Sequence, residues 1–242
     1  MFSLTKLKDS FSDVVNSFTS VHALTKQLRL AIVGGDELKA IEIYLGEADD
    51  DSSGPNNSPF RKGKEKEVAL IKNLKPSSPF TIKKYEYTTP MHLASKFGMY
   101  RLCEIFLENG GNPSCTDNLE QNCIHALLAG GSNLPHVRVK LMERLLNWKH
   151  INVNGHEENV SLNRVDIDGN SAIHHAASSG LLACVEKLVH MGGIISLVNK
   201  AQKTCCELAE ASGHTSMASI LELALVYQPV DESMAQYDRT VG

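Results

Sequence analysis

A histidine recurs along this chain at a regular spacing, and this repeat limits the fold more than any other feature. The step from His92 to His125 defines one period, and the step from His174 to Glu207 has the same length. The step from His125 to His174 is one period plus an insertion of about half a period. Self-similarity at a period of roughly 20 to 50 residues is typical of solenoids, whose units bury their apolar faces against their neighbours. The sequence therefore predicts a row of stacked units.

His92, His125, His174 and Glu207 are the four anchors of the repeat. The residues around them indicate what one unit contains. Thr89 can cap a helix, and Pro90 suits its first turn, where no backbone donor is needed. Gly98 permits the left-handed backbone that ends this helix, after which apolar residues return at helical spacing. Asp168-Gly169 is a turn signal ahead of the third anchor. Each unit is predicted to hold a turn, a short helix, a glycine corner and a second helix.

This pattern resembles the ankyrin repeat. The resemblance implies an all-α ankyrin-repeat solenoid of helix-turn-helix units joined by short hairpin loops, with a degenerate first repeat and inserted loops. In that family the histidine forms hydrogen bonds within and between repeats. The resemblance therefore implies structural roles for His92, His125 and His174, beside Thr89 and Pro90.

The chain divides into segments on the same grounds. The stretch that contains Gly35-Asp36 has helix, corner and helix but no Thr-Pro start, which is typical of a degenerate cap. The polar, Pro- and Ser-rich stretch that follows is predicted to be a flexible insertion. The predicted segments begin with an amino-terminal stretch at 1–24 that can form a helix, the capping repeat at 25–47 and the insertion at 48–86. Ankyrin repeats are predicted at 87–114, 115–165, 166–198 and 199–227, followed by a flexible tail at 228–242. The repeat at 115–165 contains an insertion, and its residues 151–164 are predicted to be a loop.

Composition and charge exclude several classes of partner. The formal charge is −4 and the pI about 6.2, without a basic domain, so nucleic acid is not an expected partner. No apolar run is long enough to cross a membrane as a helix, so we expect no membrane span. Charged residues interrupt the start of the chain, which argues against a secretory signal. We expect a monomer in the cytoplasm, with the nucleus as the alternative.

Two segments and the six cysteines have alternative interpretations. Residues 1–20 show helical apolar spacing, which fits a helix packed on the solenoid end or a partner- or membrane-facing amphipathic helix. Residues 60–75 carry several lysines, but Glu65 and Glu67 favour a solvated linker over a lipid or nucleic-acid site. The cysteines form no CxxC pair and are predicted to be thiols, buried at Cys103, Cys184, Cys205 and Cys206. We expect no metal and no cofactor.

A closer resemblance covers roughly residues 25 to 225. It rests on "AIVGGDELKAIEIY", "TPMHLASKFGM", "MERLLNWKH", "DGNSAIHHAASSGLLACVEKLVHMGG" and "KTCCELAEASGH". These stretches resemble the amino-terminal region of ankyrin-repeat and IBR-domain proteins, which are RBR-type E3 ubiquitin ligases. Their chemistry lies in a downstream RING and IBR set rich in paired zinc-binding cysteines, and the 242 residues hold no such set.

The resemblance implies a protein–protein interaction module without catalytic residues. Its partners would be ubiquitination substrates or ubiquitin machinery, which it would present to an RBR-type ligase. The alternative is a fragment of an active E3 ubiquitin-protein ligase, whose catalytic part is not among these residues.

The predicted binding face combines the hairpin tips with the exposed side of the first helices. Phe97 is the candidate anchor, and the alternative is that it packs under the 48–86 insertion. His175 either faces the groove or is a partly exposed polar residue. The predicted protein-binding residues are Leu93, Lys96, Phe97, Asn118, Leu119, Glu120, Asp168, His175, Ser179, Lys200 and Gln202.

Overall fold

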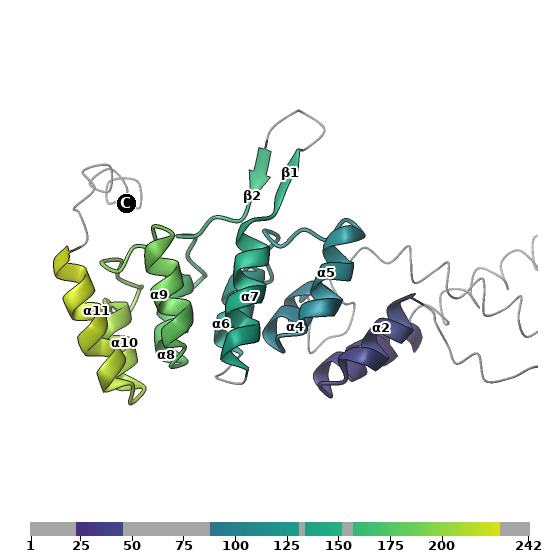
Figure 1. Cartoon of the computed structure of the whole chain (residues 1–242), viewed down its shortest axis with the longest axis horizontal. Coiled ribbons are helices and arrows are strands. Elements are labelled where there is room, and N and C mark those ends of the chain that lie inside the picture. Colours follow the sequence, from purple (N-terminus) through teal and green to yellow (C-terminus); the bar gives the residue numbers. More distant parts are fainter. Residues whose placement is uncertain (1–22, 46–87, 131–133, 152–156, 228–242) are drawn as a thin grey trace, which may run out of the picture.

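The computed structural model describes residues 23–45, 88–130, 134–151 and 157–227. In these ranges pairs of helices stand side by side along the chain, as Figure 1 shows. The predicted insertion at 48–86 and tail at 228–242, and all of the predicted segment 1–24 except its last residues, lie outside the described residues. The all-α repeat solenoid is confirmed.

The helices form two rows. The inner row holds α4 (Pro90–Lys96), α6 (Cys123–Ala129), α8 (Ala172–Ser178) and α10 (Cys205–Ala211), which contact one another in series. The outer row holds α5 (Tyr100–Glu108), α7 (Pro135–Leu146), α9 (Leu182–His190) and α11 (Thr215–Tyr227). Residues 23–33 and α2 (Glu37–Leu45) form a first unit, with α2 against α5. No helix in the described ranges is long and apolar enough to cross a membrane.

Each inner helix begins where a side chain can satisfy its free amide groups. Thr89 Oγ1 accepts from the N–H of His92 at 3.2 Å, and Pro90 occupies the first turn of α4. Asn122 Oδ1 accepts from the N–H groups of Ile124 and His125, at 3.0 and 3.1 Å, to cap α6. Local sequence chemistry therefore sets where the inner helices start.

A continuous apolar core runs between the two rows. Tyr44 of α2 and Phe106 of α5 meet edge to face, with ring centroids 4.8 Å apart and planes at 79°. Both side chains are fully buried. This contact ties the degenerate first unit to the second, as expected for a solenoid whose units contact only their neighbours.

Arg138 of α7 is a buried cation that joins two inner helices. Its guanidinium donates to the carbonyl oxygens of Lys96, at 3.1 Å, and Gly130, at 3.0 Å, and also to Leu127 O. These carbonyls lie at the carboxyl ends of α4 and α6, where the helix leaves its own acceptors unpaired. A Cβ at Gly130 would collide with Lys96 O, so the close approach of these two helix ends requires a glycine there.

The insertion after α7 has a structure that we did not predict from the sequence. We expected residues 151–164 to be a loop, but β1 (Lys149–Ile151) pairs antiparallel with β2 (Glu157–Asn159). This ribbon projects beyond the helices in Figure 1. A signal was present, since Asn154-Gly155 between two extended stretches is typical of a hairpin. Asn163 anchors the following chain by accepting from Ile194 N at 3.1 Å.

Candidate functional site

Three hairpin tips are built by the same turn. We name them the first tip (Asp117–Gln121), the second tip (Asp166–Asn170) and the third tip (Asn199–Lys203). In each tip the Oδ1 atom of the leading Asp or Asn accepts from the backbone N–H groups two and four residues on, at 2.8 to 3.0 Å. Such side-chain-to-backbone bonds fix a turn locally. Each tip therefore has a fixed shape before any partner binds.

Backbone hydrogen bonds join the tips into one ladder. Ile167 N donates to Leu119 O at 2.9 Å, which links the first tip to the second. Lys200 N donates to Asp168 O at 2.9 Å, which links the second tip to the third. The three tips are therefore held in register with one another.

Buried histidines connect the inner helices to the backbone in or just before these tips. His92 Nε2–H donates to Gln121 O at 2.9 Å, and His125 Nε2–H donates to Arg164 O at 2.9 Å. The Nδ1 atom of His125 accepts from Asn122 N at 3.2 Å, so the ring must be neutral with its proton on Nε2. Burial lowers the pKa of His125 to about 4 and also lowers the pKa values of His92 and His174. These rings are parts of the scaffold.

His175 pairs with Asp166 at the base of the second tip. His175 Nε2 lies 2.8 Å from Asp166 Oδ2, which also accepts from Gln121 Nε2 at 3.1 Å. The His175 ring packs edge-on against His125, with centroids 5.5 Å apart. Burial raises the pKa of Asp166, but the bonds from His175, Asn170 N and Gln121 outweigh it and lower that pKa overall. His175 is half-buried, and its ring nitrogen is engaged in this pair.

The predicted binding residues occupy three different environments. Leu93 is 4% exposed and belongs to the core, so its prediction as a groove residue was wrong. The reason is that Leu93 belongs to the apolar core, to which the neighbouring helices α5 and α6 also contribute. His175 and Ser179 are half-buried. The exposed residues are Lys96, Phe97, Asn118, Leu119, Glu120, Asp168, Lys200 and Gln202.

The exposed residues form two groups. Asn118, Leu119, Glu120, Asp168, Lys200 and Gln202 are all tip residues. Lys96 and Phe97 end α4, a helix about 10 Å long whose beginning lies at the tips. Phe97 is 39% exposed at this far end, and the insertion that we proposed as its alternative cover lies outside the described residues.

Three exposed apolar side chains at the tips were missed in the prediction from the sequence. Val165, Ile167 and Val198 are 40%, 41% and 50% exposed. Val165 and Val198 stand directly before the leading Asp166 and Asn199, so the repeat itself could have identified them.

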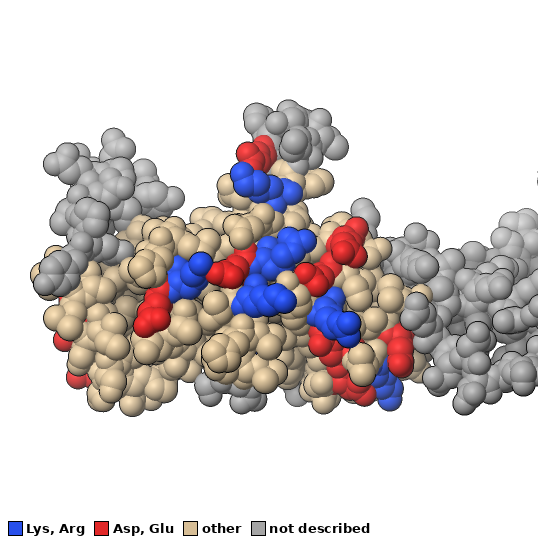
Figure 2. Space-filling view, viewed as in Figure 1, with Lys and Arg blue, Asp and Glu red and all other residues tan. Residues whose placement is uncertain are grey.

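The outer face carries charged residues of both signs. Figure 2 shows Lys and Arg mixed with Asp and Glu over α5, α7 and α9. Lys187 pairs with Glu143 at 2.6 Å, and Lys140 Nζ lies 4.3 Å from the centroid of the Tyr100 ring. Exposed pairs of this kind typically contribute at most about 1 kcal/mol each.

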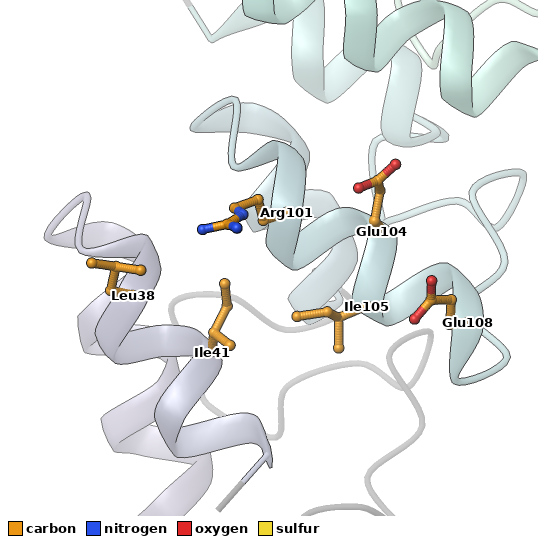
Figure 3. Close-up of a pocket in the computed structure, with 6 residues that line it drawn as sticks. All are labelled: Leu38, Ile41, Arg101, Glu104, Ile105 and Glu108. Carbon is orange, nitrogen blue, oxygen red and sulfur yellow. The ribbon is translucent and has the colours of Figure 1, made fainter. Parts of the chain in front are cut away.

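A shallow depression of about 350 Å³ lies between α2 and α5, as Figure 3 shows. Leu38, Ile41 and Ile105 give it apolar walls, and charged residues stand at its rim: Arg101, Glu104 and Glu108. It is open to solvent and brings together no nucleophile with a base.

The cysteines and histidines of the described ranges form no metal centre. No group of three or more His, Cys, Asp or Glu side chains there could hold a metal ion. The predicted buried thiols are confirmed for Cys103, Cys184, Cys205 and Cys206. Cys123 is also buried, and Cys115 is half-buried. Burial raises the pKa of Cys103 and of Cys205 to about 12, so these thiols are poor nucleophiles at neutral pH.

Comparison with known proteins agrees with this architecture. A family model described as ankyrin repeats (3 copies) matches residues 91–199. Ankyrin repeat and IBR domain-containing protein 1 of Homo sapiens is 28% identical over 233 residues, which is 88% of this chain and 20% of that protein. The Mus musculus protein of the same name is 29% identical over 234 residues, again 88% and 20%. Synphilin-1 of Mus musculus is 41% identical over 59 residues, or 24% of this chain and 6% of that protein.

The chain thus spans about a fifth of the length of the two relatives that cover most of it. The matched family, the stacked helix pairs and the bonds from buried histidines to backbone carbonyls all describe one architecture. The chain therefore carries ankyrin repeats and is homologous to ankyrin repeat and IBR domain-containing protein 1.

Proposed function

We propose that this chain is a protein-binding module and that its binding face is the row of hairpin tips together with the exposed ends of the inner helices. The observation that carries the proposal is the ladder that joins the tips, from Leu119 O to Ile167 N and from Asp168 O to Lys200 N. A preformed surface loses little conformational entropy when it binds. The residues proposed to contact a partner are Lys96, Phe97, Asn118, Leu119, Glu120, Asp168, His175, Ser179, Lys200 and Gln202.

The partners that we propose are ubiquitination substrates or components of the ubiquitin machinery. Support comes from the homology to an ankyrin repeat and IBR domain-containing protein and from the resemblance of the quoted repeats to RBR-type ligases. The chain would act as the recognition part, and any transfer chemistry would be supplied by other residues. The cytoplasm remains the predicted compartment.

Proximity labelling of the intact chain in cells tests this proposal. The wild-type chain is compared with a Phe97→Ala/Lys200→Ala variant and with Glu186→Ala, an exposed residue of the outer helix α9. We expect ubiquitin enzymes or their substrates among the labelled proteins, to be lost with the double variant and kept with Glu186→Ala. An unchanged set in the double variant would contradict the binding face, and a set without ubiquitin-related proteins would contradict the pathway. The labelled set also reports the compartment.

A further inference from the structure

Exposed apolar side chains lie in the three tips or directly before them. We name Leu119, Val165, Ile167 and Val198 the tip stripe; they are 45%, 40%, 41% and 50% exposed. Val165 and Ile167 flank Asp166, which is 3% exposed; Val165 ends the extended arm and Ile167 lies in the turn, and both apolar side chains are exposed. Ile167 is bonded through its backbone to Leu119, which places these two side by side.

Val198 extends the stripe to the third tip. It precedes Asn199 as Val165 precedes Asp166, and both residues form the same antiparallel bridge, Val165 to Ser171 and Val198 to Thr204. The repeat therefore places Val198 one unit further along the same line. Exposed apolar residues scattered singly are ordinary, but a row on a fixed ladder is typical of an interaction site.

Charge changes sign along this stripe. The first tip carries Asp117 and Glu120, and the second carries the exposed Asp168, with no basic residue in either. The third tip carries Lys200 and Lys203 and no acidic residue. Among the described residues, Glu120, Lys200 and Lys203 form no side-chain ion pair. These charges are therefore available to a partner, and their order gives the stripe a direction.

The length of the stripe sets the kind of segment that fits. Neighbouring packed helices lie roughly 8 to 10 Å apart, so the first and third tips are separated by about 16 to 20 Å. An extended chain rises about 3.3 Å per residue, so about six residues span this distance.

We propose that the tip stripe binds an extended segment of a partner protein that is apolar at its centre, basic at the end over the first tip and acidic at the end over the third tip. The inference rests on the proposed protein-binding function and specifies the chemistry of its ligand. Apolar side chains of the segment cover the stripe and supply most of the affinity. The two charged ends fix the register and suppress ligands of the opposite order.

Selection from a random library of short peptides displayed on phage, with the full-length chain as bait, tests the proposal. We expect the enriched peptides to carry basic residues, an apolar centre and acidic residues in line. Their dissociation constants, measured by fluorescence anisotropy, should rise at least about tenfold for Lys200→Glu/Lys203→Glu and for Ile167→Ser. A matched control, Lys39→Glu/Arg101→Glu, makes the same change in net charge on the outer helices α2 and α5 and should leave binding unchanged.

Reversing the charge at one end of the peptide is the most specific test of the proposed charge order. A peptide whose acidic end is replaced by lysines should bind Lys200→Glu/Lys203→Glu better than the wild-type chain. Circular dichroism and urea unfolding establish that each variant is folded. The proposal is overturned if no peptide is enriched, if the enriched peptides show no charge order, if the tip variants bind them as well as wild type does, or if the reversed peptide gains nothing.

The two proposals fail in distinguishable ways. If cellular partners are lost with Phe97→Ala/Lys200→Ala but library peptides show no charge order, the binding function stands and the stripe chemistry is wrong. If charge-ordered peptides bind the tip stripe but the set of proteins labelled in cells is the same for Phe97→Ala/Lys200→Ala as for the wild-type chain, the stripe chemistry stands and the proposed cellular function is wrong.

Discussion

Glu37 Oε1 accepts a hydrogen bond from the backbone N–H of Leu102 at 3.1 Å, so a carboxylate of α2 caps the neighbouring helix α5. Met99, the residue that precedes α5, provides no side-chain cap of its own. The first unit lacks the Thr-Pro start of the later units, yet it completes the second unit through this bond. Negative charge at a helix amino terminus is also favoured by the helix dipole.

We expect Glu37→Ala to lower the free energy of unfolding by about 1 kcal/mol, the usual effect of removing a helix cap. Glu37→Gln should lose less because the amide oxygen can still accept from Leu102 N. Urea unfolding followed by circular dichroism measures both. Glu42→Ala, on an exposed position of the same helix, is the control. A loss for Glu42→Ala equal to that for Glu37→Ala would mean that general helix effects, and not the cap, determine the result.

Arg138→Met should be strongly destabilising. The substitution keeps an apolar stem but removes the donors to Lys96 O, Leu127 O and Gly130 O, and Arg138 is 2% exposed. Leaving buried acceptors unpaired costs about 1 to 3 kcal/mol each when no water reaches them, so we expect a loss of at least about 2 kcal/mol. The same urea experiment with Lys140→Met, an exposed residue of α7, should show a change below about 0.5 kcal/mol. Equal stabilities of the two variants would contradict a structural role for the guanidinium.

Stability should fall on mild acidification because of the buried histidines. Burial lowers the pKa of His125 to about 4, so the unfolded chain binds this proton more tightly than the folded one. The contribution of the neutral His125 ring to the free energy of unfolding is complete above the ordinary histidine pKa. It is lost as the pH falls from about 6.5 toward 4, at about 1.4 kcal/mol per pH unit for each such histidine. His92 and His174 shift in the same direction.

Urea unfolding at pH 7.5, 6.5, 5.5 and 5.0 measures this dependence. His125→Gln should be less stable at pH 7.5 but should show a shallower decline toward pH 5. An unchanged slope in this variant would show that the acid sensitivity arises elsewhere. The lowered pKa of Asp166 acts in a lower window, since its contribution is lost only below the ordinary aspartate pKa.

Features set by local chemistry could be predicted from the sequence, and features set by contacts between units could not. Thr89 and Pro90 predict where α4 starts because a cap acts over a few residues. Leu93 was assigned to the groove from the register of the repeat, but it belongs to the apolar core, and core membership depends on how helices pack together. The alignment of Ile167 with Leu119 likewise depends on a bond between residues of different units, which no local pattern specifies.

The fourth residues of the three tips are Glu120, Gly169 and Gln202, and substitutions at two of them give opposite predictions for stability. Glu120 and Gln202 adopt a φ of 57° and Gly169 a φ of 79°, all in the left-handed region that favours glycine. At Gly169 a Cβ would also lie 2.9 Å from Lys200 N, the donor that joins the second tip to the third. We therefore expect Gly169→Ala to cost at least about 1 kcal/mol and to separate these two tips.

Gln202→Gly should do the opposite on a smaller scale. It relieves the strain of a left-handed non-glycine residue, but the greater freedom of glycine in the unfolded chain offsets part of the gain, so a change within about 1 kcal/mol in favour of the folded state is expected. Native-state hydrogen exchange of the Lys200 amide separates the two effects. Gly169→Ala should speed its exchange by more than the loss of global stability explains, because its acceptor at Asp168 O moves, whereas Gln202→Gly should leave it protected. If the Lys200 amide in Gly169→Ala exchanges only through global unfolding, the ladder between the tips is not held by this turn.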